Sequence, residues 1–242
     1  MQRVAVLALL VSISMPLTAQ NGRGYLFGEP KVSLTLFGGF AQPGAGGDLW
    51  AFTFDELTLG RGDLASIERG GDVAVRVSPR FDLVLSYAVS DARSRSEVRD
   101  WVDENGDPIR QTTRFTRRPL GLSARYYFRD RGRALGNYAW VPARFVPFAS
   151  LGFGRMSYSM DQAGEFVESG TNEIFTDRYR AEGRASFAQL GFGASFTIAP
   201  AVVLTGEARY LRASGDGEPS FTGFDRLDLS GLSTSLGLTL RL

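Results

Sequence analysis

The stretch that decides the fold is Ala188–Ile198, which reads AQLGFGASFTI. Apolar side chains stand at every second position, and the positions between them hold Gln, Gly, Ser and Thr. A period of two is the signature of a β-strand that has one apolar face and one polar face. This segment therefore predicts a strand. The side chains on its polar face are unusually small.

The same alternation recurs along the rest of the chain. It is found in seven further segments, at residues 32–36, 73–77, 83–89, 120–128, 149–153, 202–210 and 232–242. No segment of useful length has the period of a helix. Eight strands of about ten residues suit one closed barrel. The sequence therefore predicts an all-β chain, folded as an eight-stranded antiparallel up-and-down β-barrel.

The connections between these strands alternate in length. Ser78-Pro79-Arg80 and Ala199-Pro200-Ala201 are tight turns, each with a proline where strand pairing must stop. Residues 130–143 form an intermediate connection at the same end. The remaining connections are expected to be long loops, at residues 41–68, 91–114, 156–184 and 212–226. Within the second of these, Asn105-Gly106 predicts a hairpin turn and a β-ribbon beyond the barrel.

The first residues have the pattern of an export signal. One positive residue, Arg3, precedes an apolar run from Val4 to Val11, and small residues lead up to Ala19. We expect residues 1–19 to be a signal peptide and residues 20–242 to be the barrel domain.

Periodicity alone leaves open which face of the strands points inward. A soluble lipocalin-like barrel would enclose its apolar face, whereas a transmembrane barrel would turn that face outward to lipid. The polar faces are rich in Gly, Ser and Thr, which favours a narrow packed lumen. Aromatic residues near the strand ends resemble two interfacial girdles, formed by Phe81, Phe128, Phe145, Phe148 and Phe196 at one end and by Phe40, Tyr87, Phe187 and Tyr210 at the other. These features favour the transmembrane barrel.

Two segments carry a resemblance to a known family. Tyr126-Tyr127-Phe128 closes one strand, and Val146–Gly154 (VPFASLGFG) opens the next. This pattern resembles the small eight-stranded outer-membrane β-barrels of the outer membrane protein A and X type. The resemblance implies location in the cell outer membrane of a Gram-negative bacterium, with periplasmic termini. It also implies contact with outer-membrane lipid and lipopolysaccharide, insertion by the barrel-assembly machinery, and a monomeric state.

The composition excludes several kinds of chemistry. The chain has no Cys and no His, so thiolate sites and triads that use His as the base are impossible. The small outer-membrane enzymes of similar architecture depend on a His, so we expect no enzyme activity, no cofactor and no metal site. The 27 basic residues nearly balance the 26 acidic ones, which argues against nucleic-acid binding.

Charged residues also fall on the polar faces of the strands, where they are expected to line the lumen. This predicted network consists of Asp72, Arg76, Asp82, Arg125, Arg129, Glu207, Arg209 and Arg241. In a barrel of eight strands, side chains are expected to fill the interior. The network is therefore interpreted as a structural plug. The alternative is a gate, in which Glu207 exchanges partners among Arg76, Arg125 and Arg209.

The long connections have regional charges that the overall balance hides. Residues 156–182 hold six acidic side chains against two arginines, whereas residues 129–144 hold four arginines against one aspartate. Asp103, Asn105 and Asp107 have the opening spacing of a calcium loop, but Arg114 occupies the position of its bidentate Glu. We therefore expect hydrated loops rather than a calcium site.

Together, these observations predict a structural or surface-interaction role through the long extracellular loops. A narrow porin, or a conduit of the outer membrane protein W type for small apolar molecules, is the alternative. An adhesin or immune-evasion protein would require loop-dependent binding to host surfaces. The sequence identifies no ligand that would decide between them.

Overall fold

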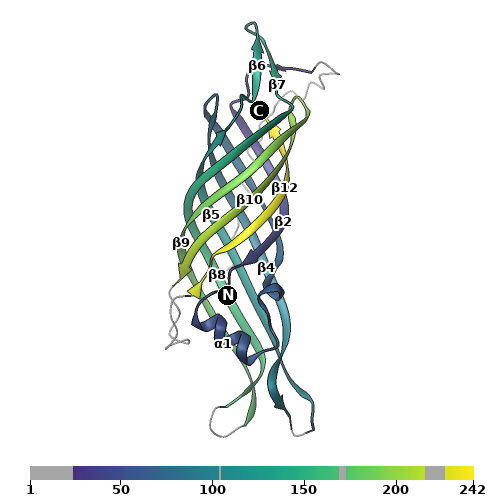
Figure 1. Ribbon diagram of the computed structural model, residues 1–242, viewed down its shortest axis with the longest axis vertical. Helices are drawn as coiled ribbons and strands as arrows, with labels where there is room; N and C mark the ends of the chain where they lie inside the picture. The colour runs from purple at the N-terminus through teal and green to yellow at the C-terminus, as the bar shows by residue number, and fades with distance from the viewer. Residues whose placement is uncertain (1–23, 104, 169–172, 216–226) are drawn as a thin grey trace, which may run out of the picture.

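The computed structural model describes residues 24–103, 105–168, 173–215 and 227–242, and its main feature is one closed ring of eight strands (Figure 1). The predicted signal peptide lies outside these residues, as does most of the predicted loop 212–226. The ring strands are β2 (Val32–Pro43), β3 (Ser66–Ser78), β4 (Phe81–Val102), β5 (Pro108–Tyr127), β8 (Phe145–Val167), β9 (Ile174–Ala199), β10 (Val202–Gly215) and β12 (Gly231–Arg241).

Each strand of the ring pairs antiparallel with its neighbours along the chain. The last strand, β12, pairs with the first, β2, through Leu238 opposite Leu36, and this pairing closes the ring. The structure confirms the predicted eight-stranded up-and-down barrel. The two proline-containing turns are confirmed as well, since Ser78-Pro79-Arg80 joins β3 to β4 and Ala199-Pro200-Ala201 joins β9 to β10.

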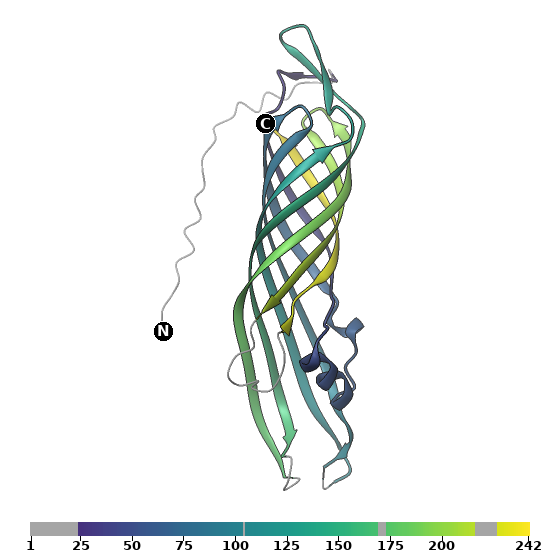
Figure 2. The ribbon, with the colours of Figure 1, turned by 60° about the vertical axis from the view of Figure 1, so that its left-hand side comes forward.

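The strands differ greatly in length, so the barrel has a short half and a long half. β10, β12, β2 and β3 have between 11 and 14 residues, whereas β4, β5, β8 and β9 have between 20 and 26. A strand that crosses a bilayer needs about 9–11 residues. The four long strands therefore continue as a sheet well beyond the ring, at the end away from the tight turns (Figure 2).

We call this continuation the extended wall, and it comprises residues 91–102, 108–118, 155–167 and 174–186. Its strands stay paired, from Asp91 opposite Thr116 to Glu97 opposite Arg110, from Arg118 opposite Ser157 to Gln111 opposite Gly164, and up to Val167 opposite Ile174. The ribbon predicted at Asn105-Gly106 is confirmed, and Gly106 adopts a φ of 83° in its turn. The prediction that 156–184 is a loop was wrong, because this segment is mostly strand.

The connection between β2 and β3 contains the helical structure. Helix α1 (Asp48–Glu56) is followed by the 3₁₀ helix η1 (Arg61–Leu64), and both lie at the long-strand end. No helix in the described residues combines the length and the apolarity that crossing a membrane requires. The predicted loop 41–68 is thus a folded element.

A small second sheet lies at the opposite end, where Leu242 is also found (Figure 1). It consists of β6 (Gly132–Leu135), β7 (Ala139–Pro142) and β1 (Leu26–Phe27), with β7 in the middle. The intermediate connection 130–143 therefore forms a hairpin. This hairpin brings Trp140, which is 3% exposed, to the end of the lumen.

Candidate functional site: the filled lumen and the outer belt

The two faces of the barrel wall differ in polarity in the way that a transmembrane barrel requires. Outward-pointing apolar side chains are exposed, with Leu36 at 77%, Phe153 at 68% and Leu238 at 57%. The inward face carries buried polar and charged groups such as Asp72, Arg125 and Glu207. A soluble protein rarely exposes a continuous apolar belt of this kind. The inverted arrangement is therefore confirmed, and the lipocalin-like alternative is wrong.

The predicted aromatic girdles are present, with two exceptions. Phe81, Phe128, Phe145 and Phe196 are exposed toward the tight turns, and Phe40, Tyr87 and Tyr210 are exposed toward the extended wall. Phe148 and Phe187 are only 1% and 4% exposed, because each lies on the inward face of its strand. Their assignment to the girdles was wrong, since it used nearness to the strand end and disregarded the alternation of the faces.

A cluster of four charged residues occupies the middle of the lumen. Asp72 comes from β3, Arg125 from β5, and both Glu207 and Arg209 from β10. Glu207 Oε2 lies 3.0 Å from Arg125 Nη2 and 2.9 Å from Arg209 Nη2, and Asp72 Oδ2 lies 3.4 Å and 3.0 Å from the same two nitrogens. Two guanidinium groups and two carboxylates therefore balance each other in a water-poor interior.

Neutral groups complete this lumen cluster. Ser86 donates a hydrogen bond of 2.5 Å to Asp72, and Ser150 donates one of 2.9 Å to Glu207. The Arg125 guanidinium lies 4.4 Å from the centre of the Phe148 ring, and the Arg209 guanidinium lies 5.0 Å from that of Phe37. Each arginine is thus held by charge, by hydrogen bonds and by an aromatic face.

Glycine makes the necessary space beside the cluster. A Cβ atom placed on Gly191 would lie 2.6 Å from Glu207 Oε1 and would also collide with Ser150 Oγ. Gly191 therefore has a steric role, because the absence of a side chain there leaves room for Glu207 and Ser150 in the narrow lumen.

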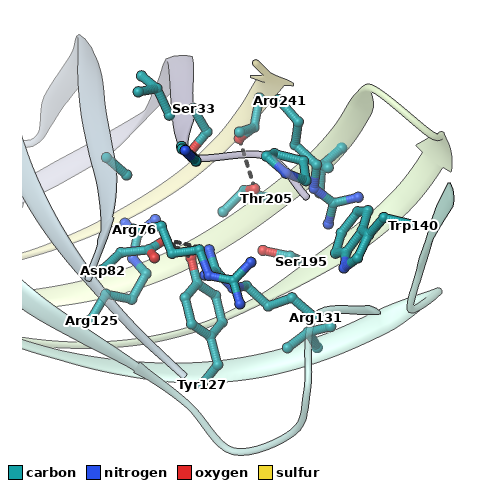
Figure 3. Close-up of a pocket in the computed structure, with 17 residues that line it drawn as sticks. Ser33, Arg76, Asp82, Arg125, Tyr127, Arg131, Trp140, Ser195, Thr205 and Arg241 are labelled. Atoms are coloured by element: carbon teal, nitrogen blue, oxygen red, sulfur yellow. Dashed lines mark hydrogen bonds and ion pairs between the residues drawn. The ribbon is translucent and has the colours of Figure 1, made fainter. Parts of the chain in front are cut away.

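A second polar group lies nearer the tight turns (Figure 3). Asp82 accepts hydrogen bonds of 2.8 Å from the Tyr127 hydroxyl and from Arg131. Arg131 also lies over the Tyr127 ring, at 4.6 Å. The cavity among these residues has a volume of about 40 Å³, with Arg241 and Trp140 at its edge. Such a space holds a few water molecules.

Two of the remaining predicted lumen residues, Arg76 and Arg241, line this same cavity with Asp82 and Arg125. Arg76 forms an ion pair with Glu29, and Arg241 donates to Thr197 and lies 5.4 Å from the Trp140 ring. Arg129 follows the end of β5 and is exposed, so it lies outside the lumen. The sequence-based list missed Arg131 and Tyr127. The alternation of β5 would have placed Tyr127 on the inward face, whereas Arg131 lies beyond any strand pattern.

The end of the lumen next to the extended wall is filled by apolar side chains. Trp50 of α1 is fully buried and meets Phe115 of β5 at 5.3 Å between ring centres. Leu57, Leu59 and Leu64 join the same cluster, with Ile109 and Met160 from the wall. On the side of this apolar plug that faces the barrel, Arg117 donates hydrogen bonds to the carbonyl oxygens of Leu229 and Ser230. The sequence did not reveal the plug, because its residues follow no strand period.

Comparisons with known proteins identify no family for this chain. No protein-family model matches the chain, and no curated protein matches it significantly. Solved structures that are similar to it include the following three. Neisserial surface protein A is 12% identical, covers 91% of this chain and 98% of its own, and has a TM-score of 0.49. OprG, an outer membrane protein from Pseudomonas aeruginosa, is 13% identical, with coverages of 90% and 99% and a TM-score of 0.46.

The third is Ail, the attachment invasion locus protein of Yersinia pestis, which is 10% identical, with coverages of 88% and 99% and a TM-score of 0.42. The closed ring of eight strands and the exposed apolar belt by themselves give the chain the fold class of an eight-stranded transmembrane β-barrel, combined with a lumen that charged and apolar side chains fill.

Proposed function

We propose that this chain is an integral protein of the outer membrane, with a barrel closed to ion flow and an extended wall that serves as a contact surface outside the cell. The observation that supports this proposal most strongly is the combination of a filled lumen with a sheet that continues far beyond the membrane-spanning ring.

The exposed belt supports membrane insertion. Side chains such as Leu85, Leu190 and Leu236 are between 44% and 58% exposed on the outer face. Transfer of apolar surface from water to lipid is favourable by about 25 cal/mol for each Å². Each strand of the ring pairs with a neighbour on both sides, so the ring has no open edge in the hydrocarbon region.

The filled lumen supports a closed barrel. Glu207, Arg125, Asp72 and Arg209 join strands on opposite sides of the lumen. An ion that passes this level must displace a balanced network of buried charges, which is unfavourable. The apolar plug around Trp50 adds a second obstacle at the other end. Both argue against the porin alternative.

The extended wall supports a surface-interaction role. Its hairpins are braced by ion pairs such as Asp91–Arg114 and Asp161–Arg178, each with a shortest N–O distance of 2.5 Å. A preorganised sheet loses little entropy when it binds a partner. In this proposal the wall faces outward, the tight turns and the termini face the periplasm, and the protein is a monomer that the barrel-assembly machinery inserts.

The proposal is tested by electrical recording on the refolded chain in planar bilayers. We expect no steady conductance from the intact protein, nor from a variant in which residues 165–176 are replaced by Asn-Gly. Steady conductance that changes in Glu207→Ala would contradict the closed barrel and favour the porin. Labelling of intact cells tests the orientation: in Thr176→Cys, the single thiol of the chain stands exposed on the extended wall and must react with a membrane-impermeant maleimide. Protection of this thiol contradicts the proposed direction.

A further inference from the structure

We propose that Arg118, Arg155 and Arg184 form a binding site for the phosphate groups of the outer-leaflet glycolipid, lipid A of lipopolysaccharide. This inference rests on the proposed membrane location and orientation. The three arginines belong to β5, β8 and β9, and all three side chains are exposed on the outer face of the barrel.

The strand register brings these arginines together. Ser157 of β8 stands opposite Arg118 on one side and opposite Arg184 on the other. Arg155 lies two residues from Ser157 on the same face of β8, so it is a diagonal neighbour of both other arginines. Diagonal neighbours in a sheet are about 7–8 Å apart. The three positive charges therefore border one serine hydroxyl.

Neighbouring carboxylates are held mainly by other arginines, and only Asp91 among them also attracts Arg118. Glu182 pairs with Arg180 at 2.8 Å, Asp161 pairs with Arg178, and Asp91 pairs with Arg114. Within the described part of the chain, Arg118, Arg155 and Arg184 form no ion pair. Like charges at this spacing repel each other, so an anion bound among them would be stabilised by all three.

The site lies at the level where a lipid headgroup meets the apolar belt. Arg155 stands opposite Leu120, which in turn stands opposite Tyr87 of the aromatic girdle. One step nearer the membrane centre, Leu122 and Phe153 face each other. A lipid with its phosphates on the arginines would therefore lay its acyl chains along Leu122 and Phe153. A free phosphate ion has no acyl chains and would not contact this apolar surface.

The surface has the shape to receive a headgroup. A shallow basin of about 410 Å³ lies over the same strands, and its lining includes Arg118, Arg184, Ser157, Ser159, Thr116 and the ion pair Arg180–Glu182. Arg155 is not part of this lining and stands at the next outward position of β8, two residues before Ser157. Guanidinium groups bind phosphate through two parallel hydrogen bonds, and hydroxyl groups add further donors. The basin thus combines charge, donors and an adjoining apolar surface.

The test compares wild-type protein with R118Q/R184Q, both refolded in detergent micelles and titrated with purified bisphosphorylated lipid A. We expect binding at least about tenfold weaker in the double variant, because charge-assisted hydrogen bonds to phosphate are lost. R118K/R184K keeps the charge but loses the paired geometry, so its affinity should be intermediate. R129Q/R133Q removes two exposed charges from the opposite end and should bind as wild type does.

Three results would overturn the inference. They are equal binding by wild type and R118Q/R184Q, an equal loss in R129Q/R133Q, and competition by inorganic phosphate as effective as that by lipid A. Folding of each variant is checked by the mobility of unheated protein in gels. Wild-type protein that does not insert into lipid bilayers would contradict the proposed membrane role, whereas inserted protein whose lipid A binding is independent of the arginines contradicts only this site.

Discussion

Glu207 on β10 reaches across the lumen to Arg125 on β5, with 3.0 Å between Oε2 and Nη2, although these two strands are not neighbours in the sheet. The contact therefore ties opposite walls of the barrel together. Since Arg209 contacts the same carboxylate oxygen, Glu207 neutralises two cations at once.

Removal of this carboxylate should destabilise the barrel strongly. Glu207→Ala leaves Arg125 and Arg209 buried with only Asp72 between them. Breaking a buried ion pair from one side costs about 3–5 kcal/mol. We expect a loss of this size in urea unfolding of the protein in lipid vesicles. The exposed Glu97, which lies 3.7 Å from Arg110, provides the control, and Glu97→Ala should cost less than about 1 kcal/mol.

A methyl group at Gly191 should disturb the same network. In Gly191→Ala the new Cβ would lie against Glu207 and Ser150, whose positions are fixed by hydrogen bonds. Overpacking of this kind costs about 1–3 kcal/mol. At Gly206 a Cβ would meet only Leu236, at 3.8 Å, so Gly206→Ala is a matched control. Equal free energies of unfolding for the two variants in urea would show that the lumen has room for a methyl group beside Glu207, which contradicts close packing there.

The docking of helix α1 should depend on Trp50. Trp50→Ala removes a fully buried side chain from the apolar plug and should weaken the docking by roughly 3 kcal/mol. Asp55 on the same helix is exposed, so Asp55→Ala should have little effect. Hydrogen exchange measures the difference, because amides of 48–56 should lose protection while amides of β12 keep theirs. Unchanged exchange in Trp50→Ala would contradict a docked helix.

The ribbon formed by β8 and β9 should be insensitive to mild acid. The hydrogen bond from Arg178 holds the pKa of Asp161 below its ordinary value of 3.8. A lowered pKa in the folded state means that the stabilising contribution is complete above 3.8 and is lost as the pH falls through the lower value. An NMR titration of the Asp161 carboxyl group should show this, and Arg178→Gln should raise the midpoint. An unshifted midpoint in the wild type would contradict the pair.

The sequence alone predicts the ring of eight strands, because each of these strands has one face toward lipid and one toward the lumen. Alternation therefore placed Asp72, Arg125, Glu207 and Arg209 on the inward face before any contact was known. It could not pair them, because partners across the lumen depend on the stagger of all eight strands.

Alternation could not predict the apolar plug or the extended wall, and the reason is physical. In the segment 155–186 the outward positions hold Arg, Ser, Asp and Glu instead of apolar residues, so the contrast between the two faces reverses above the membrane. Trp50 and its neighbours pack against the inner face of this wall from a helix, which has a different period. Arg131 reaches Asp82 from a connection whose path no pattern predicts.

Because the strands differ in length, closure of the ring leaves the longer strands with unpaired edges beyond it. Pairing between β9 and β10 ends at Phe187 opposite Ala213, so residues 174–186 of β9 have no strand on that side among the described residues. A free edge can pair with a strand from another molecule. Arg178, Arg180, Glu182 and Arg184 occupy alternate positions along it, and their charges oppose such pairing by a second copy. The charged residues of the wall therefore oppose aggregation along an edge of β9 that closure of the ring leaves uncovered.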